Sequence, residues 1–407
     1  MEKADIYGAQ QKFDHFLEVA SEKIPIKENR TAILDYCKDL KRRGIGVHRI
    51  TKYASALQIV SGMLGKPFKK VGRKDLERWF DALDKRMGRS GKPITSESKR
   101  DYVVAIKLFY KWLFKTEQYP EQVAWMKAPK RNGNHLVAEQ LLTDEDVKNI
   151  VRAASNPRDI AFVELLFESG CRIGELLSLQ IKNLSFDEHG AVVVVDGKTG
   201  QRRVRVIASE KALKKWLERH PNRDNREAYL FINSAEGYSN EVWQYPAARK
   251  VLRQLFKKAK ITKPSNPHFF RHSRASIFAN QLTESQLKAY FGWTQSSDMA
   301  AQYVHLSGRD IDNALLKING ISVPSDQATE NKFKLQECPR CHEQNDPAAI
   351  YCDRCTAPLT VEIALQQEST LAQLIKQVVR EELKTPEGYA TAEKRLLSTF
   401  RKENNNE

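Results

Sequence analysis

Apolar residues recur every three or four positions through most of residues 11–116, as they do along one face of an amphipathic helix. The segments TAILDYCKDLKRRG and SESKRDYVVAIKLFYKWLFK show this spacing, and breaks such as RRGIG and GKPFKK separate the periodic stretches. We therefore predict a helical domain over residues 11–126. The periodicity is lost over KAPKRNGNHLVAEQ, residues 127–140, which are predicted to be a linker.

A second periodic region begins at LTDEDV, where Thr143 and Asp146 have the spacing of a helical capping box. Helical patterns continue to about residue 185 and resume later in the domain. Between them, AVVVVDGKTGQRRVRVI has β-branched runs on both sides of GKTGQ, which predicts a β-hairpin. The predicted fold class is therefore mainly α with a small β-sheet (α+β), and this second domain is placed over residues 141–321.

Four cysteines follow in CPRCHEQNDPAAIYCDRC, as two C-x-x-C pairs separated by ten residues. Each pair can place two thiolates on one ion, and four thiolates make a closed tetrahedral site, so we predict a structural zinc ion in a ribbon over residues 336–360. The predicted zinc ligands are Cys338, Cys341, Cys352 and Cys355. A redox pair of disulfides is the alternative. Zinc ribbons bind nucleic acid or protein, and the sequence does not decide between them.

Residues 361–407 are predicted to be a helical tail. The apolar residues that share one stripe of this helix are Leu371, Leu374, Ile375, Val378 and Leu383. Such a stripe is expected to pack on its own domain, with a partner helix as the alternative.

The chain is strongly basic, with a formal net charge of +16 and a pI near 9.4. Residues 1–140 contain 29 Lys and Arg against 17 Asp and Glu, and so carry most of the excess. A solubilising surface and a nucleic-acid-binding surface both fit this charge, since clustered cations displace counterions from a phosphate backbone. The basic residues that we predict to contact DNA are Lys41, Arg42, Arg43, Lys99 and Arg100.

No segment approaches the ~18 consecutive apolar residues of a membrane span, and the N-terminal stretch lacks the apolar core of a signal peptide. The six cysteines do not form a disulfide framework, because four of them crowd into eighteen residues. Cys37 and Cys171 are predicted to be small core residues. We expect a cytoplasmic, nucleoid-associated protein with no membrane partner.

An ordered series of chemically active residues runs through the second domain. Taken singly, each has an ordinary explanation: an arginine can pair with a nearby glutamate, a hairpin lysine is commonly exposed, and a cluster of His and Arg is commonly a solvated helix face. No Cys or carboxylate lies near that cluster in sequence to complete a metal site. The series is Arg172 in SGCRIGELL, Lys198 in GKTG, His268 and Arg271 in NPHFFRHSR, Trp293 in YFGWTQ and Tyr303 in AQYVHLS.

The combination and order of these residues resemble the tyrosine site-specific recombinase, or phage integrase, family. In that family an arginine is followed by I-G/S-E-L, a hairpin lysine, H-x-x-R-H, G-H or G-W, and a nucleophilic tyrosine, usually in Y-x-H. The resemblance spans about residues 141–317. The preceding basic helical domain resembles the family's core-binding domain, whereas the cysteine ribbon is not part of the family's minimal pattern.

The resemblance implies an enzyme that cleaves and rejoins duplex DNA through a 3′-phosphotyrosine intermediate, and the chemistry of the residues agrees with it. Tyr303 is expected to be the nucleophile, while the guanidiniums of Arg172 and Arg271 stabilise the charge that develops on the phosphate oxygens. Lys198 is expected to protonate the departing 5′ oxygen. Because the bond energy is conserved in the phosphotyrosine, neither ATP nor a catalytic cofactor is expected.

The remaining residues of the series have supporting or alternative roles. His268 is expected to accept the tyrosine proton or to hydrogen-bond the phosphate. Trp293 replaces a more common histidine and can donate a hydrogen bond but cannot shuttle protons. Glu175 is expected to hold Arg172 in orientation. His272 is expected to support the fold beneath the site, and Arg274 is expected to contact the backbone elsewhere.

Family members act as four protomers on two DNA sites, so the resemblance implies duplex DNA and a homotetramer as partners, with residues 308–321 docking on a neighbouring protomer. Two alternatives share these features: a type IB topoisomerase, which acts alone, and a DNA-binding regulator that has kept the scaffold without activity. The H-x-x-R-H block and the helical domain favour a recombinase, and neither the nucleophile nor an arginine is missing. The sequence leaves open the DNA site and the choice among integration, excision and dimer resolution.

Overall fold

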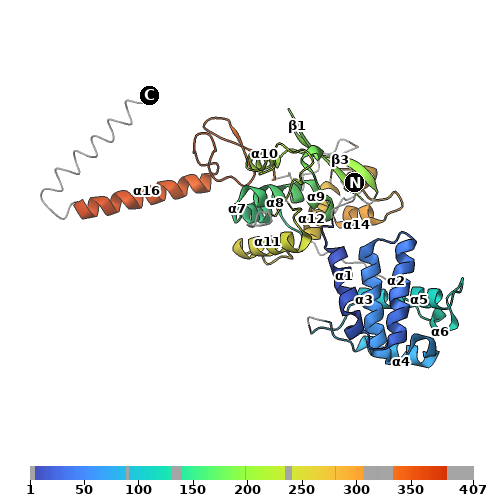
Figure 1. Ribbon diagram of the computed structural model, residues 1–407. Helices are drawn as coiled ribbons and strands as arrows, with labels where there is room; N and C mark the ends of the chain where they lie inside the picture. Colours follow the sequence, from blue (N-terminus) through green and yellow to red (C-terminus); the bar gives the residue numbers. More distant parts are fainter. Residues whose placement is uncertain are drawn as a thin grey trace. The chain divides into compact units, whose positions relative to one another are not determined.

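The computed structural model describes residues 5–88, 91–129, 140–197, 199–233, 241–279, 281–306, 319 and 333–382. Lys198, most of the predicted linker, almost all of the predicted docking segment and the end of the tail lie outside these residues. The chain divides into two compact units, one of residues 1–140 and 232–248 and the other of residues 141–231 and 249–407 (Figure 1). Across the described ranges, no helix is both long and apolar enough to span a membrane.

Helices build the described part of the first unit, as the sequence pattern predicts. In α2 the buried positions Ile33, Tyr36, Cys37 and Leu40 follow the three- and four-residue spacing of one helix face. They join a core that also contains Phe68 and Phe109, and this core ties α2, α3 and α5 together. The helices of this unit are α1 (Ala9–Lys23), α2 (Lys27–Arg42), α3 (Val47–Leu64), α4 (Arg73–Asp84), α5 (Ser96–Leu113) and α6 (Glu121–Ala124), with a 3-10 turn, η1 (Phe68–Lys70).

The second unit combines helices with a small sheet. Its first helices are α7 (Asp144–Arg152), α8 (Pro157–Ser169) and α9 (Ile173–Leu177), followed by the 3-10 turn η3 (Ile181–Asn183). The predicted capping box is confirmed, because Thr143 accepts a hydrogen bond from the Asp146 amide and the Asp146 carboxylate accepts one from the Thr143 amide. The later helices are α10 (Glu210–Glu218), α11 (Tyr245–Lys258), α12 (Pro267–Ala279), α13 (Glu284–Phe291) and α14 (Met299–Leu306). Residues 245–248, at the start of α11, are grouped with the first unit.

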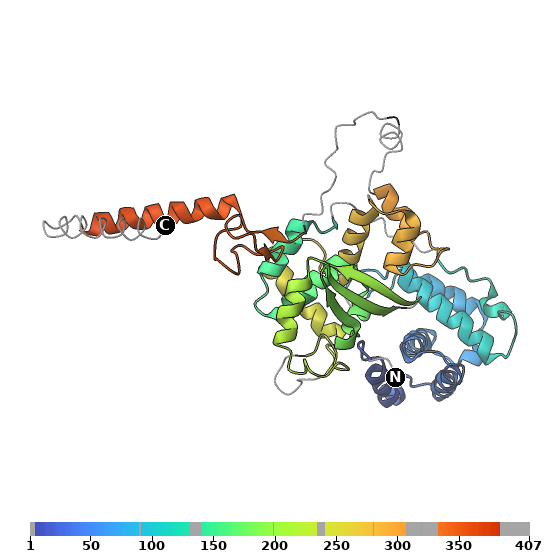
Figure 2. The same ribbon diagram turned by 90° about the horizontal axis from the view of Figure 1, so that it is seen from above.

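Helix α8 is the centre of this unit. Its residues from Ala161 to Ser169 are all buried, and it packs against α7, α10, α12 and strand β3. The antiparallel sheet has the order β1 (Leu184–Asp187), β2 (Gly190–Gly197) and β3 (Gly200–Val206), drawn in green in Figure 2. The register pairs Gly197 with Gly200, which confirms the predicted hairpin around GKTG.

The cysteine ribbon contains the short strands β4 (Gln336–Glu337) and β5 (Gln344–Asn345) and packs within the second unit. Phe333, which precedes it, is fully buried and packs edge-on against Phe167 of α8. Helix α16 (Val361–Glu382) follows. The predicted packing of its apolar stripe is not seen at the one stripe residue whose side chain is described, because Ile375 is 48% exposed.

Candidate active site

Helix α12 places Arg271 of the H-x-x-R-H motif against the C-terminal end of α8. Arg271 is 5% exposed, and its guanidinium donates to the carbonyl oxygens of Gly170 (2.9 Å) and Phe291 (2.5 Å). It also lies over the rings of Phe291 and Trp293, at 5.0 and 5.5 Å from their centroids. Burial and the nearby charge of Arg172 lower the pKa of Arg271 to about 10, so the guanidinium remains charged at neutral pH.

Arg172 is the N-cap residue of α9, where Glu175 contacts its side chain and its backbone amide. Its Nη1 donates to Glu175 Oε1 at 2.8 Å, its backbone amide donates to Glu175 Oε2 at 2.9 Å, and its Nη2 donates to the Gly292 carbonyl at 3.3 Å. The side chain is one third exposed, so its guanidinium is fixed and still reachable from solvent. The predicted pairing of Glu175 with Arg172 is confirmed.

Arg202 of β3 is a site residue that the sequence did not reveal. It donates to both Glu175 oxygens, at 2.7 and 3.1 Å, to the Tyr290 carbonyl at 2.8 Å and to Cys171 Sγ at 3.7 Å. Burial would raise the pKa of Glu175, but the hydrogen bond and charge of Arg202, together with the contacts from Arg172, lower it to about 2. Glu175 is therefore a carboxylate shared by two arginines. Nothing in the run QRRVRV distinguishes Arg202 from its neighbours.

The hairpin tip reaches the same network on both sides of Lys198. Thr199 donates its hydroxyl to the Gly292 carbonyl at 3.2 Å. A Cβ atom on Gly197 would lie 2.6 Å from Glu175 Oε1, so only glycine fits there without displacing the carboxylate. Gly292 ends α13 with a φ of +60°, and a Cβ there would lie 3.0 Å from Arg202 Nη1. Lys198 itself lies outside the described residues.

Trp293 and Tyr303 stack in parallel, with ring centroids 5.5 Å apart and an interplanar angle of 3°. Tyr303 is only 1% exposed, and burial raises the pKa of its phenol, an effect that the charge of Arg271 partly offsets. Its hydroxyl is hydrogen-bonded to Nδ1 of His272. The sequence assigned His272 a supporting role in the fold, whereas the structure places it against the predicted nucleophile.

The two histidines of the motif lie one turn apart on α12. Part of the His268 side chain is open to solvent, but desolvation by the surrounding protein, followed by the charges of Arg271 and Arg172, lowers its pKa. Burial, followed by the charges of His268 and Arg271, lowers the pKa of His272 to about 4. Arg274 is buried and donates to the Glu168 carbonyl at 2.9 Å, so it contacts the backbone of the protein itself.

The structure thus brings together most of the predicted catalytic series. Arg172, Arg271, Trp293 and Tyr303 are linked by direct contacts or through Gly292 and Phe291. His268 lies close enough to both arginines for their charges to act on it. Two cations and a phenol in one place are the groups required for nucleophilic attack on a phosphodiester.

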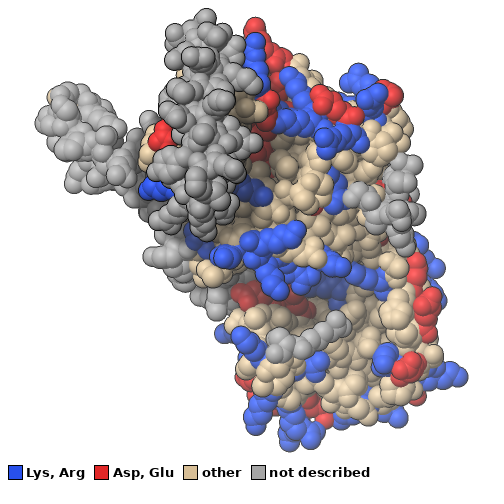
Figure 3. All heavy atoms as spheres, turned by 90° about the vertical axis from the view of Figure 1, so that its left-hand side faces the viewer, with Lys and Arg blue, Asp and Glu red and all other residues tan. Residues whose placement is uncertain are grey.

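The predicted DNA-contacting residues of the first unit fall into two groups. Lys41, Arg42 and Arg43 are exposed at the end of α2, although Arg43 lies 3.5 Å from Asp39. Lys99 is paired with Asp84, and Arg100 donates to the Pro129 carbonyl at 2.9 Å, so both have intramolecular partners. Acidic side chains are interspersed among the basic ones on the face shown in Figure 3. The roles of all five residues stay predictions.

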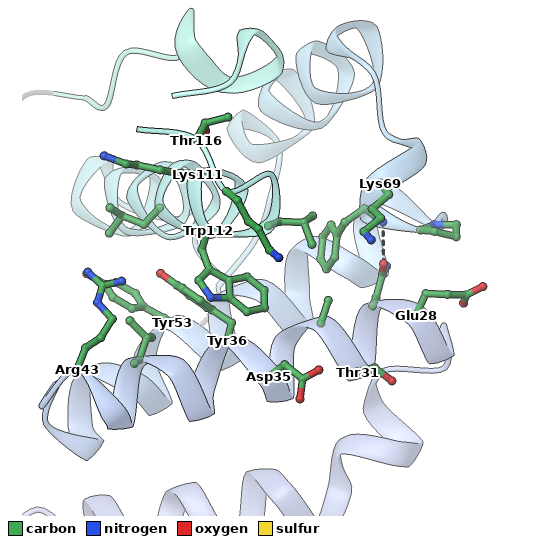
Figure 4. Close-up of a pocket in the computed structure, with 18 of the residues that line it drawn as sticks. Glu28, Thr31, Asp35, Tyr36, Arg43, Tyr53, Lys69, Lys111, Trp112 and Thr116 are labelled. Carbon is green, nitrogen blue, oxygen red and sulfur yellow. Dashed lines mark hydrogen bonds between the residues drawn. The ribbon is translucent and has the colours of Figure 1, made fainter. Parts of the chain in front are cut away.

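A groove of about 1170 Å³ lies among α2, α3 and α5 of the first unit. Figure 4 shows the rings of Tyr36, Tyr53 and Trp112 close together within it, with Arg43 and Lys111 nearby. Clustered cations along a groove suit the phosphates of DNA, because they displace counterions from the backbone. The basic residues that line the groove are Lys27, Arg43, Arg49, Lys69, Lys70, Lys111 and Lys115.

The four cysteines of the ribbon form one cluster. Their sulfur atoms all lie within 4.8 Å of one another, with Sγ atoms 3.5 Å apart for Cys338 and Cys355 and 3.6 Å apart for Cys341 and Cys352. These separations are too long for disulfide bonds and suit four thiolates around one ion. The amides of Arg340 and Arg354 each donate to a cysteine sulfur at 3.4 Å. The cluster could therefore hold a metal ion.

Comparisons with known proteins agree with this geometry. Residues 140–309 match the model of the phage integrase family. The chain is 26% identical over 72% of its length to a probable integrase/recombinase protein of Methanocaldococcus jannaschii, covering 92% of that protein, and 25% identical over 67% of its length to the tyrosine recombinase XerA of Saccharolobus solfataricus, covering 88%.

A solved structure shares the fold as well. A lambda integrase tetramer bound to a Holliday junction is similar with a TM-score of 0.52 and 18% identity, over 69% of this chain and 78% of that one. The sequence matches, and the arrangement of Arg172, Arg271, Trp293 and Tyr303, lead to the same assignment. Residues 140–309 therefore form a phage integrase domain, and over most of its length the chain is similar to tyrosine recombinases.

Proposed function

We propose that this protein is a site-specific recombinase that cleaves duplex DNA with Tyr303 and rejoins it through a 3′-phosphotyrosine intermediate. The observation that carries the proposal is the convergence of Arg172 and Arg271 beside the stacked pair of Trp293 and Tyr303. A phosphodiester bound there meets two guanidiniums that are already held in place. Fixed charges of this kind stabilise the oxygens of the transition state without reorganising.

The remaining steps follow from the chemistry of the residues. Tyr303 forms the bond to phosphorus while the bond to the 5′ oxygen breaks, and Lys198 supplies the proton to that leaving oxygen. The phosphotyrosine keeps the energy of the phosphodiester, so rejoining proceeds without ATP. The arginines neutralise the phosphate, and we propose that no catalytic metal is required.

The alternatives have less support. Two relatives that this chain covers over most of their length are named as an integrase/recombinase and as a tyrosine recombinase, and neither a type IB topoisomerase nor a non-catalytic regulator is favoured. The lambda integrase structure is a tetramer on a Holliday junction, which supports duplex DNA and three further copies of this chain as partners. We propose that the basic groove of the first unit, which Arg43 helps to line, contributes to DNA binding.

We also propose that the cysteine cluster holds a structural zinc ion. Four thiolates leave no open coordination position, so the ion would stabilise the ribbon and take no part in cleavage. His342, next to Cys341, is directed instead to Glu337 at 2.7 Å.

Covalent trapping tests the function. The full-length protein is mixed with duplexes from either side of its gene, nicked so that the cleaved fragment diffuses away, in magnesium-free buffer without chelator. Denaturing gels are expected to show a protein–DNA adduct with the wild type and none with Tyr303→Phe, which retains the ring and its stacking on Trp293. An adduct in the Tyr303→Phe protein would contradict the assignment of the nucleophile.

A further inference from the structure

The phenol of Tyr303 is held at two points. Trp293 lies parallel to its ring, and Nδ1 of His272 is the hydrogen-bond partner that the described residues provide for its hydroxyl. The rings of His272 and Tyr303 are 5.8 Å apart at an angle of 32°. Trp293 therefore fixes the plane of the nucleophile, and His272 fixes the oxygen that would react.

A buried phenol needs a base. Tyr303 is 1% exposed, and burial raises the pKa of its hydroxyl, so it does not ionise unaided at neutral pH. The indole of Trp293 has a donor nitrogen and no acceptor, so it cannot take the proton. Of the two histidines, His268 is exposed and its ring centroid lies 6.3 Å from that of His272, whereas His272 contacts the hydroxyl directly.

His272 is in the protonation state that an acceptor requires. The groups acting on it are His268 and Arg271, and burial together with their charges lowers its pKa to about 4. The imidazole is then neutral at pH 7. With the phenol donating to Nδ1, the proton of the neutral ring sits on Nε2. Negative phosphate arriving at Arg172 and Arg271 would make the ring more basic when the proton must move.

We propose that His272 is the proton acceptor for Tyr303 during DNA cleavage. The inference rests on the proposed function. As the bond from Tyr303 Oη to phosphorus forms and the bond to the 5′ oxygen breaks, the Oη–H bond breaks and an Nδ1–H bond forms on His272. Lys198 protonates the leaving oxygen separately, and rejoining returns the proton from His272 to the phenol. His268 is then left to hydrogen-bond the phosphate.

Single-turnover cleavage of the nicked duplex by the full-length protein provides the test. His272→Asn keeps an acceptor oxygen at the position of Nδ1 but has no basic nitrogen, and we expect it to cleave roughly 100-fold more slowly or worse, with DNA binding retained. The matched control is His189→Asn, on the exposed turn between β1 and β2, which should cleave at the wild-type rate.

Two further readouts separate proton transfer from structural support. The cleavage rate of the His272→Asn protein should keep rising with pH where the wild-type rate has levelled off, because only solvent can take the proton. Free imidazole should partly restore His272→Ala. A duplex with sulfur at the 5′ bridging position, whose thiolate leaves without a proton, should restore Lys198→Ala but not His272→Asn.

Each outcome bears on a different claim. If the His272→Asn protein cleaves DNA as fast as the wild type, or faster, the inference is overturned and the proposed function still stands. An unchanged pH profile with slower cleavage would also overturn it and would make His272 a structural residue. Failure of the wild type to form any Tyr303-dependent adduct would instead remove the proposed function itself.

Discussion

Arg202 shows how much of the site depends on a residue whose own side chain is only 10% exposed. It joins three elements, because it lies on β3, neutralises Glu175 of α9 and donates to the Tyr290 carbonyl of α13. Glu175 in turn orients Arg172. A carboxylate buried between two guanidiniums is stable only while both charges remain, since removing one partner leaves an uncompensated buried charge.

Arg202→Gln should therefore destabilise the second unit and slow cleavage. We expect a loss of roughly 3 kcal/mol in the free energy of unfolding at neutral pH, measured by urea titration. Arg203→Gln is the matched control, because Arg203 is exposed, and it should change stability by less than about 0.5 kcal/mol. Equal stability losses in the two variants would contradict the role given to Arg202.

The difference in the free energy of unfolding between the wild type and Arg202→Gln should depend on pH. Glu175 has a pKa of about 2 in the folded protein against an ordinary value of 4.5, so its contribution is complete above pH 4.5 and is lost as pH falls toward 2. The gap between wild type and Arg202→Gln should accordingly narrow below pH 4.5.

Sequence and structure differ most in the network around the predicted catalytic residues. Arg172 and its pairing with Glu175 could be predicted, because the two residues lie three positions apart. Arg202 could not, because its partners lie 27 and 88 residues away and any of the arginines in QRRVRV could have occupied its place. The contact of His272 with Tyr303 spans 31 residues and depends on how α12 packs against α14.

At the scale of elements, local chemistry made the hairpin and the helices predictable. The β-branched run and the turn GKTG encode β2 and β3, and the capping box marks the first residue of α7. What local chemistry does not encode is the direction of the hairpin. Thr199 contacts Gly292 at the end of α13, and Gly197 lies beside Glu175 of α9. These contacts depend on how α8 and the sheet place the hairpin relative to the two helices.

Gly197→Ala tests whether the hairpin must approach the arginine network so closely. The added Cβ would lie 2.6 Å from Glu175 Oε1 and 3.1 Å from Arg202 Nη1, and neither atom can yield because each is held by the other. We expect cleavage to fall roughly 10-fold or more in the single-turnover assay, since misplacing a catalytic group by about 1 Å has effects of this size.

The control for this change is Gly62→Ala in α3, where a Cβ meets nothing within 4 Å. It should fold with equal or slightly higher stability, because alanine favours helix over glycine. Normal cleavage by Gly197→Ala would show that the hairpin moves away from Glu175 when DNA is bound.

At the scale of the whole molecule, the ribbon belongs to the second unit more closely than its place in the sequence suggests. Lys211 of α10 pairs with Glu343, and Lys215 pairs with Asp346 and Asp353. Arg152 of α7 donates to the Ala348 carbonyl at 3.1 Å. The spacing of the cysteines predicted a metal site, but these contacts span more than 130 residues and could not be read from it.

Metal removal should therefore weaken the second unit as well as the ribbon. A four-thiolate site supplies part of the folding free energy of the segment that contains it, and here that segment packs on α7 and α10. If the loss reaches about 2 kcal/mol, the midpoint of thermal unfolding of this unit should fall by roughly 4–8 °C. Calorimetry of the protein before and after chelation measures it, and elemental analysis of the purified protein identifies the ion.

Cys352→Ser separates the effect of the ion from other effects of the chelator. The variant should unfold near the temperature of the chelated wild type, and adding chelator to it should cause no further change, because both treatments remove the same ion. A midpoint that stays constant under both treatments would mean that the contacts of Lys211 and Lys215 hold the ribbon without metal. A chelator effect that persists in Cys352→Ser would place the ion at other ligands.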